Sequence, residues 1–146
     1  MPEKASKYYY HALKLDDNDI RAHYGAAKSL VLSKKNIDRA ADHYKFVIKR
    51  DTKHHLALCE LGLIYFEKKE YEKSAELIKE SIKVNPKFTF GFVTMGNLLF
   101  EVGRHKNASK YYKQALKISP NDAQALIGLG NCLYELGKVT ESVANY

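Results

Sequence analysis

Residues 55–88 (HLALCELGLIYFEKKEYEKSAELIKESIKVNPKF) and residues 89–122 (TFGFVTMGNLLFEVGRHKNASKYYKQALKISPND) align without a gap over 34 positions, and residues 123–146 continue the same register. Several residue types coincide at once, which chance alternation of apolar and polar residues would not produce. A fixed period in this range is typical of a solenoid, in which each unit leaves an apolar face that only its neighbours can cover. The positions in step include Gly62, Gly96 and Gly130, Ser74 and Ala108, and Pro86 with Pro120.

Each unit is predicted to contain two helices. In the first half of residues 55–88, Leu58, Leu61, Gly62 and Tyr65 stand at i, i+3, i+4 and i+7, which is one face of a helix. A glycine inside a helix costs about 1 kcal/mol relative to alanine. Its recurrence therefore predicts that the two helices of a unit approach too closely there for a side chain.

The turns between the helices are indicated by glycine and proline. Gly103 and Gly137 stand between the expected helices of their units, where a positive φ commonly ends a helix. Pro86 and Pro120 follow the second helices, because proline can stand beyond a helix end but cannot continue the helix. Turns this short predict that the two helices are antiparallel.

The register continues upstream with one slip. Residues 12–15 (ALKL) match residues 115–118 (ALKI) at a spacing of 103, where three units of 34 would give 102. The spacing returns to 34 from Ala40 onward, so we place the extra residue in the turn around residues 33–37, since turns tolerate insertions better than helices.

This pattern resembles the tetratricopeptide repeat (TPR) family, whose units carry Leu-Gly, an aromatic residue, small residues and a final proline at fixed offsets. The resemblance implies an all-α fold, a right-handed superhelix of helix-turn-helix units. The whole chain is then one array: residues 1–19 are the second helix of an incomplete repeat, 20–54 a degenerate repeat, 55–88 and 89–122 complete repeats, and 123–146 a truncated repeat.

Composition narrows the function classes. The chain has 146 residues and a formal net charge of +7, with most basic residues interleaved with apolar ones at helical spacing. It contains no apolar run long enough to span a membrane and no secretory signal, so we expect a cytoplasmic or nuclear protein without membrane insertion. Cys59 and Cys132 are expected to be buried thiols.

The same sequence offers no catalytic constellation. No Ser-His-Asp or Cys-His arrangement can be assembled locally, and no phosphate-binding loop follows a strand. His55 and Cys59 share a helical face, but no second pair completes a metal site. We therefore expect no enzyme activity, no cofactor and no bound metal.

The family resemblance implies that partners bind on the concave face, which the first helices line. The carried-over positions supply apolar and aromatic side chains with a few polar groups. Asn97 and Asn131 could bond to a peptide backbone, the aromatic residues could anchor a ligand, and the recurring glutamates could attract a basic segment. The expected groove residues are Tyr24, Lys28, Cys59, Leu63, Phe66, Glu67, Phe90, Val93, Asn97, Phe100, Glu101, Ile127, Asn131, Tyr134 and Glu135, with Arg21 as a further counterpart.

The leading hypothesis is a protein-interaction scaffold that binds a partner peptide or helix within a larger assembly. The Lys, Asn and Arg set with which chaperone-binding members hold a terminal carboxylate is absent at Cys59, Glu60, Val93 and Thr94. Two alternatives stay open. One is an RNA-binding helical repeat, suggested by the lysines and 11 tyrosines. The other is a segment that self-associates through uncapped ends.

Overall fold

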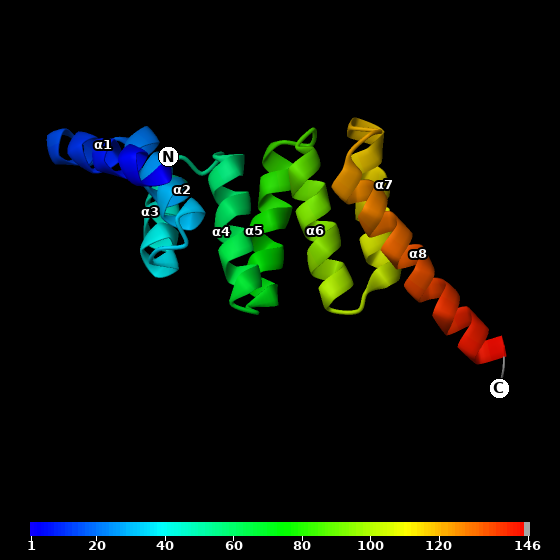
Figure 1. Cartoon of the computed structure of the whole chain (residues 1–146). Coiled ribbons are helices and arrows are strands. Elements are labelled where there is room, and N and C mark those ends of the chain that lie inside the picture. The colour runs from blue at the N-terminus through cyan, green and yellow to red at the C-terminus, as the bar shows by residue number, and fades with distance from the viewer. Residues whose placement is uncertain (145–146) are drawn as a thin grey trace. The chain divides into compact units, whose positions relative to one another are not determined.

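The computed structural model describes the backbone of residues 1–144 and the side chains of residues 1–140. All regular secondary structure in that range is helical, which confirms the predicted all-α fold (Figure 1). The helices are α1 (Pro2–Leu15), α2 (Ile20–Leu32), α3 (Ile37–Arg50), α4 (His55–Glu67), α5 (Tyr71–Val84), α6 (Thr89–Glu101), α7 (His105–Ile118) and α8 (Ala123–Ala144).

The chain forms two compact units. The first comprises residues 1–77, and the second comprises residues 78–146, so the boundary falls inside α5.

In the first unit, α1 packs on α2, α2 on α3, and α3 on α4. The core of this unit contains the fully buried side chains of Ala40, Tyr44 and Val47. The Ser74 hydroxyl of α5 donates a hydrogen bond of 2.7 Å to the Gly62 carbonyl of α4. This buried bond confirms that the two helices of residues 55–88 approach closely at the recurring glycine.

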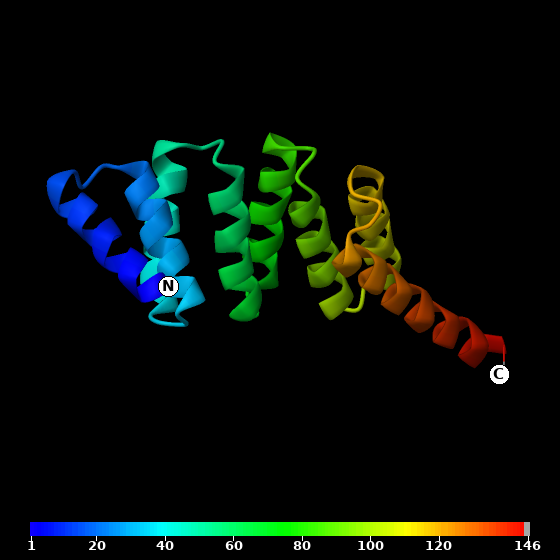
Figure 2. The same ribbon diagram turned by 45° about the horizontal axis from the view of Figure 1, so that its top comes forward.

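In the second unit, α6, α7 and α8 follow one another in alternating directions, and α6 contacts both α7 and α8 (Figures 1 and 2). The ring of Tyr112, on α7, lies between two glycines. A Cβ at Gly96 would stand 2.6 Å from this ring, and a Cβ at Gly128 would stand 2.3 Å from it. Gly96 is thus a close-approach glycine, as its recurrence predicted, because a tyrosine ring occupies the space of its side chain.

The turns within the helix pairs share one geometry. Lys34, Lys69 and Gly103 have φ of 53°, 61° and 80°, and the next residue donates its N–H to a carbonyl five residues earlier. This is the bonding of a Schellman helix end. The predicted extra residue lies in the first of these turns, which has four residues instead of three: Asn36, with φ of 41°, caps α3 by accepting from Arg39 N at 3.0 Å.

The prediction of a turn at Gly137 is wrong. α8 continues through this position as one helix to Ala144. Side-chain bonds of helical spacing span the glycine: Lys138 donates to Glu135 at 3.3 Å, and the Thr140 hydroxyl donates to the Leu136 carbonyl at 3.0 Å. A glycine permits a positive φ but does not impose one. The second helix expected from residues 138–146 is therefore not seen through residue 144, and Tyr146 lies outside the described residues.

Candidate functional site

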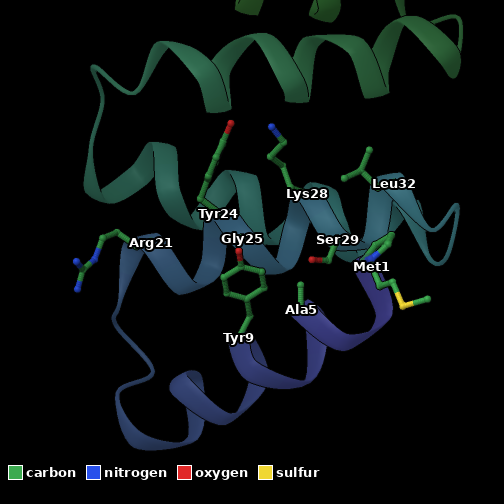
Figure 3. Close-up of a pocket in the computed structure, with 10 residues that line it drawn as sticks. Met1, Ala5, Tyr9, Arg21, Tyr24, Gly25, Lys28, Ser29 and Leu32 are labelled. Carbon is green, nitrogen blue, oxygen red and sulfur yellow. The ribbon is translucent and has the colours of Figure 1, made fainter.

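A pocket of about 580 Å³ lies between α1 and α2 in the first unit (Figure 3). Ala5 and Tyr9 extend from α1 toward α2, and Tyr24 and Lys28 project from α2 on the side away from α1. The pocket is lined by Met1, Pro2, Ala5, Tyr9, Arg21, Tyr24, Gly25, Lys28, Ser29 and Leu32.

The charged side chains that line this pocket are both cationic. Arg21 is almost fully exposed and lies 3.6 Å from the Asp19 carboxylate, which is outside the lining. The Lys28 ammonium lies 5.9 Å from the centroid of the Tyr24 ring. Because no carboxylate lines the pocket, its local field favours an anionic or neutral ligand over a cationic one.

Tyr24 is held in place by neighbouring rings. Its ring contacts Tyr44 at 5.8 Å and His54 at 4.9 Å between centroids. Burial, and to a smaller extent the Glu60 carboxylate, raises the pKa of Tyr24 to about 12. The Tyr24 hydroxyl is therefore a neutral hydrogen-bonding group at neutral pH. Burial also raises the pKa of Glu60, an effect partly opposed by Lys28.

The remaining groove positions of the first unit lie on α4. Cys59 is fully buried, so in this arrangement it supports the helix and presents no contact surface. Leu63 and Phe66 are half-buried, and the Phe66 ring packs edge-on against Tyr71 at 5.8 Å. Glu67, the last residue of α4, is exposed.

Asn97 is the best-defined polar group among the groove positions of the second unit. Its side chain is exposed, and its Oδ1 accepts a hydrogen bond of 2.6 Å from the Tyr112 hydroxyl. Burial, followed by Cys132, raises the pKa of Tyr112 to about 12, so this hydroxyl keeps its proton at neutral pH. With Oδ1 engaged, the two Nδ2 hydrogens are the donors that this exposed amide can offer to a partner.

Aromatic and apolar groups flank Asn97 on α6. Phe90 is partly exposed and packs edge-on against Phe88 at 5.9 Å, and Phe100 is half-buried against His105 at 4.7 Å. Val93 is buried in the core of this unit, whereas Glu101 is exposed at the end of α6. Only part of the predicted set on α6 can therefore contact a partner.

On α8, the predicted residues are more open. Ile127, Asn131 and Tyr134 are exposed. The Lys138 ammonium lies 4.3 Å from the Tyr134 ring centroid and also pairs with Glu135. Among the described side chains, Glu135 is the one of the recurring glutamates Glu67, Glu101 and Glu135 that pairs with a cation, which lessens its attraction for a basic ligand.

Two kinds of residue at these sites were not singled out from the sequence. Gly25 and Gly128 are close-approach glycines, since a Cβ at either would stand 2.3 Å from Tyr9 or Tyr112. Their shared spacing of 103 residues was the signal that could have identified them. His23 and His43 form a Nδ1–Nδ1 contact of 2.8 Å that no local pattern indicated.

Two further features are absent from the described residues. No group of three or more His, Cys, Asp or Glu side chains there is close enough to hold a metal ion. None of the described helices has both the length and the apolar character that crossing a membrane requires.

Comparison with known families gives two matches. Residues 55–88 match a model described as a tetratricopeptide repeat, and residues 96–137 match a second model described as a TPR repeat. Together the matched residues make up more than half of the chain. No curated protein sequence matches the chain significantly.

Solved structures resemble the chain in fold. A crystal structure of MamA is 21% identical, has a TM-score of 0.83, and covers 98% of this chain and 83% of its own. The first TPR of Spaghetti (RPAP3), bound to the HSP90 peptide SRMEEVD, is 19% identical with a TM-score of 0.76 over 81% of this chain and 95% of its own. YrrB, described as a TPR protein with an unusual peptide-binding site, is 21% identical and has a TM-score of 0.78. The alignment covers 96% of this chain and 72% of the YrrB chain.

Proposed function

Since the chain belongs to the tetratricopeptide repeat family, we propose that it is a protein-interaction scaffold that binds an extended peptide or helix on the first-helix face of its repeats. The proposal extends to a role within a larger protein assembly. Two structures of similar fold have descriptions that name a bound peptide or a peptide-binding site, which supports a peptide as the ligand class.

The observation that carries this proposal is the fixed amide of Asn97. A free asparagine side chain can rotate, and its ordering would reduce binding affinity. Here the Tyr112 hydroxyl holds Oδ1 at 2.6 Å while the side chain stays exposed. The Nδ2 group is thus preorganised to donate to a peptide carbonyl, and the half-buried Phe100 lies one turn away on the same helix as an apolar anchor.

The experiment selects peptides on the chain from a displayed random library and measures their affinities for variants. Asn97→Ala and Asn97→Asp should each weaken binding about fivefold, since one hydrogen bond contributes about 1 kcal/mol. The aspartate still accepts from Tyr112 but cannot donate. Phe100→Ala should weaken binding at least as much, because it removes a partly exposed ring.

The matched control is Asn107→Ala. Asn107 is also an exposed asparagine, but it lies in the first turn of α7 and outside the proposed face. We expect the control to bind like the unmodified chain. Equal affinity of all four variants for every selected peptide would contradict binding on the α6 face.

A further inference from the structure

The helix pair α1–α2 repeats the helix pair α7–α8. The two pairs share sequence at a spacing of 103 residues, and in both an aspartate side chain caps the second helix. In α1–α2 the ring of Tyr9 lies where a Cβ of Gly25 would be, at 2.3 Å. In α7–α8 the ring of Tyr112 lies against Gly128 at the same distance. The helix that packs on α7–α8 therefore indicates what kind of helix could pack on α1–α2.

The α7–α8 pair has a third helix packed on it, and the α1–α2 pair has a pocket instead. α6 contacts α7 and α8 and places Gly96 against the Tyr112 ring, where a Cβ would stand 2.6 Å from it. Tyr9, the counterpart of Tyr112, lines the α1–α2 pocket. Ala108 of α7 is fully buried beneath α6, whereas its counterpart Ala5 is partly exposed in the pocket. In the described part of the chain, this pocket occupies the place that α6 fills on α7–α8.

α8 carries the matching uncovered face. Residues 123–135 align with α6, and the apolar stripe that α6 turns toward α7 recurs on α8. Leu126 is 51% exposed and Leu133 is 56% exposed. A Cβ added at Gly130 would meet nothing within 4 Å in the described chain, although Gly96, at the same repeat position, lies against a ring.

The charges of the two surfaces are compatible. Residues 123–135 contain one carboxylate, Glu135, and no lysine or arginine. The pocket is lined by Arg21 and Lys28 and by no carboxylate. Because Glu135 already pairs with Lys138 and Arg21 lies near Asp19, charge permits a helix like α8 in this pocket, and the repeated packing of the two helix pairs favours it.

We propose that α8 of one copy of this chain lies in the α1–α2 pocket of a second copy, in the position that α6 takes on α7–α8. Gly130 packs against the Tyr9 ring, and Asn131 accepts from the Tyr9 hydroxyl as Asn97 accepts from Tyr112. The contact is head-to-tail and completes one helix pair from two chains. This contact uses α1, α2 and α8, whereas the peptide-binding test above uses variants on α6, so the two proposals can fail independently.

The first test measures the molar mass of the 146-residue chain by light scattering and sedimentation from low micromolar to millimolar concentration. We expect a reversible rise above the monomer mass of 16.7 kDa. Gly130→Ala should weaken this association at least about tenfold, because the Tyr9 ring already packs tightly against Gly25 and the new methyl group would overpack the proposed contact.

The matched control is Gly137→Ala. This control makes the same substitution in the same helix, and a Cβ at Gly137 would also meet nothing within 4 Å. Gly137 lies beyond the segment of α8 that aligns with α6. Its counterpart Gly103 has nothing within 4 Å either. Gly137→Ala should therefore associate like the unmodified chain, while both glycine variants keep their helicity by circular dichroism.

A mixing experiment tests the head-to-tail arrangement. Ala5→Glu places a charge in the pocket and leaves α8 intact, whereas Gly130→Ala alters α8 and leaves the pocket intact. At a concentration where the unmodified chain associates and a tenfold weaker junction does not, each variant alone should be a monomer. An equimolar mixture should form a dimer with one intact junction and nothing larger. A monomeric unmodified chain at every concentration would overturn the proposal, as would a mixture that stays monomeric or a Gly137→Ala variant that loses association.

Discussion

The same substitution at two equivalent glycines should change stability by different amounts. Replacing a helical glycine with alanine stabilises a helix by about 1 kcal/mol when the methyl group has space. Gly130→Ala has that space, because a Cβ there meets nothing within 4 Å. Gly96→Ala does not, since its Cβ would stand 2.6 Å from the Tyr112 ring.

The ring cannot yield to the Gly96 methyl group. A Cβ at Gly128 would also lie 2.3 Å from the same ring, so the ring packs tightly against α8 as well, and the Tyr112 hydroxyl is bonded to Asn97. Overpacking of a dense core costs about 1–3 kcal/mol. The gain in helix propensity is common to both variants and cancels, so Gly96→Ala should be less stable than Gly130→Ala by about 2 kcal/mol.

Thermal and urea unfolding, followed by circular dichroism on dilute samples, measures this difference. For a chain of this size, about 2 kcal/mol corresponds to a difference of about 6 °C between the two midpoints. Equal midpoints for the two variants would refute the claim that Tyr112 fills the position of a Gly96 side chain. Gly96→Ala combined with Tyr112→Leu should recover part of the loss, because it removes the ring atoms that the methyl group meets.

Three further predictions concern single groups. Tyr44→Phe should leave the free energy of unfolding unchanged or raise it, because the buried Tyr44 hydroxyl has no hydrogen-bond partner. Tyr112→Phe should lower the free energy of unfolding by about 1 kcal/mol in denaturant titrations, because it removes the hydrogen bond to Asn97. Burial, and after it the nearby His23, lowers the pKa of His43 below its ordinary 6.5. The unfolded chain therefore takes up a proton more readily than the folded chain, and the folded chain should lose stability as pH falls below 6.5. His43→Gln should flatten that dependence in unfolding curves measured across the range. A backbone hydrogen bond from Ala22 lowers the pKa of Asp19, so its stabilising contribution should be lost as pH falls through the lowered pKa, and Asp19→Asn should reduce this acid sensitivity.

The pH prediction for His43 depends on what faces the ring. His23 of α2 lies 2.8 Å away through the two Nδ1 atoms, Tyr10 of α1 packs on the ring at 6.0 Å, and Arg39 and Asp42 of α3 act on it at longer range. The His23 Nε2 lies 2.9 Å from the Asp17 carbonyl and so carries the proton of that bond. His43 then donates to His23, and its own buried Nε2 has no partner that could stabilise an added proton.

Much of the fold could be predicted from the sequence because its causes are local. Apolar spacing gives the helices, and Pro86 and Pro120 stand just beyond α5 and α7 as expected. The one-residue slip was correctly placed in the turn before α3, since a turn accommodates an insertion through one residue of positive φ, here Asn36. The close approach at Gly62 and Gly96 followed from their recurrence inside helices.

The candidate site was less predictable because it depends on which side chains neighbouring helices cover. Cys59 and Val93 occupy groove positions by register, but both are buried. Asn97 was expected to be free for a partner, and the structure ties one of its two polar atoms to Tyr112. No sequence pattern reports such a bond, because its two residues lie on different helices and their distance is set by packing.

The sequence by itself determined that this chain is a series of helix pairs with a period of 34 residues and where its turns fall up to α7. Those features depend on residues within a few positions of one another. Only the tertiary structure decided that Gly130 is open while Gly96 is filled, that Gly137 lies within a helix, and that a pocket stands between α1 and α2. These outcomes depend on whether a distant helix packs on a given face, since equivalent residues differ in environment when their neighbours differ.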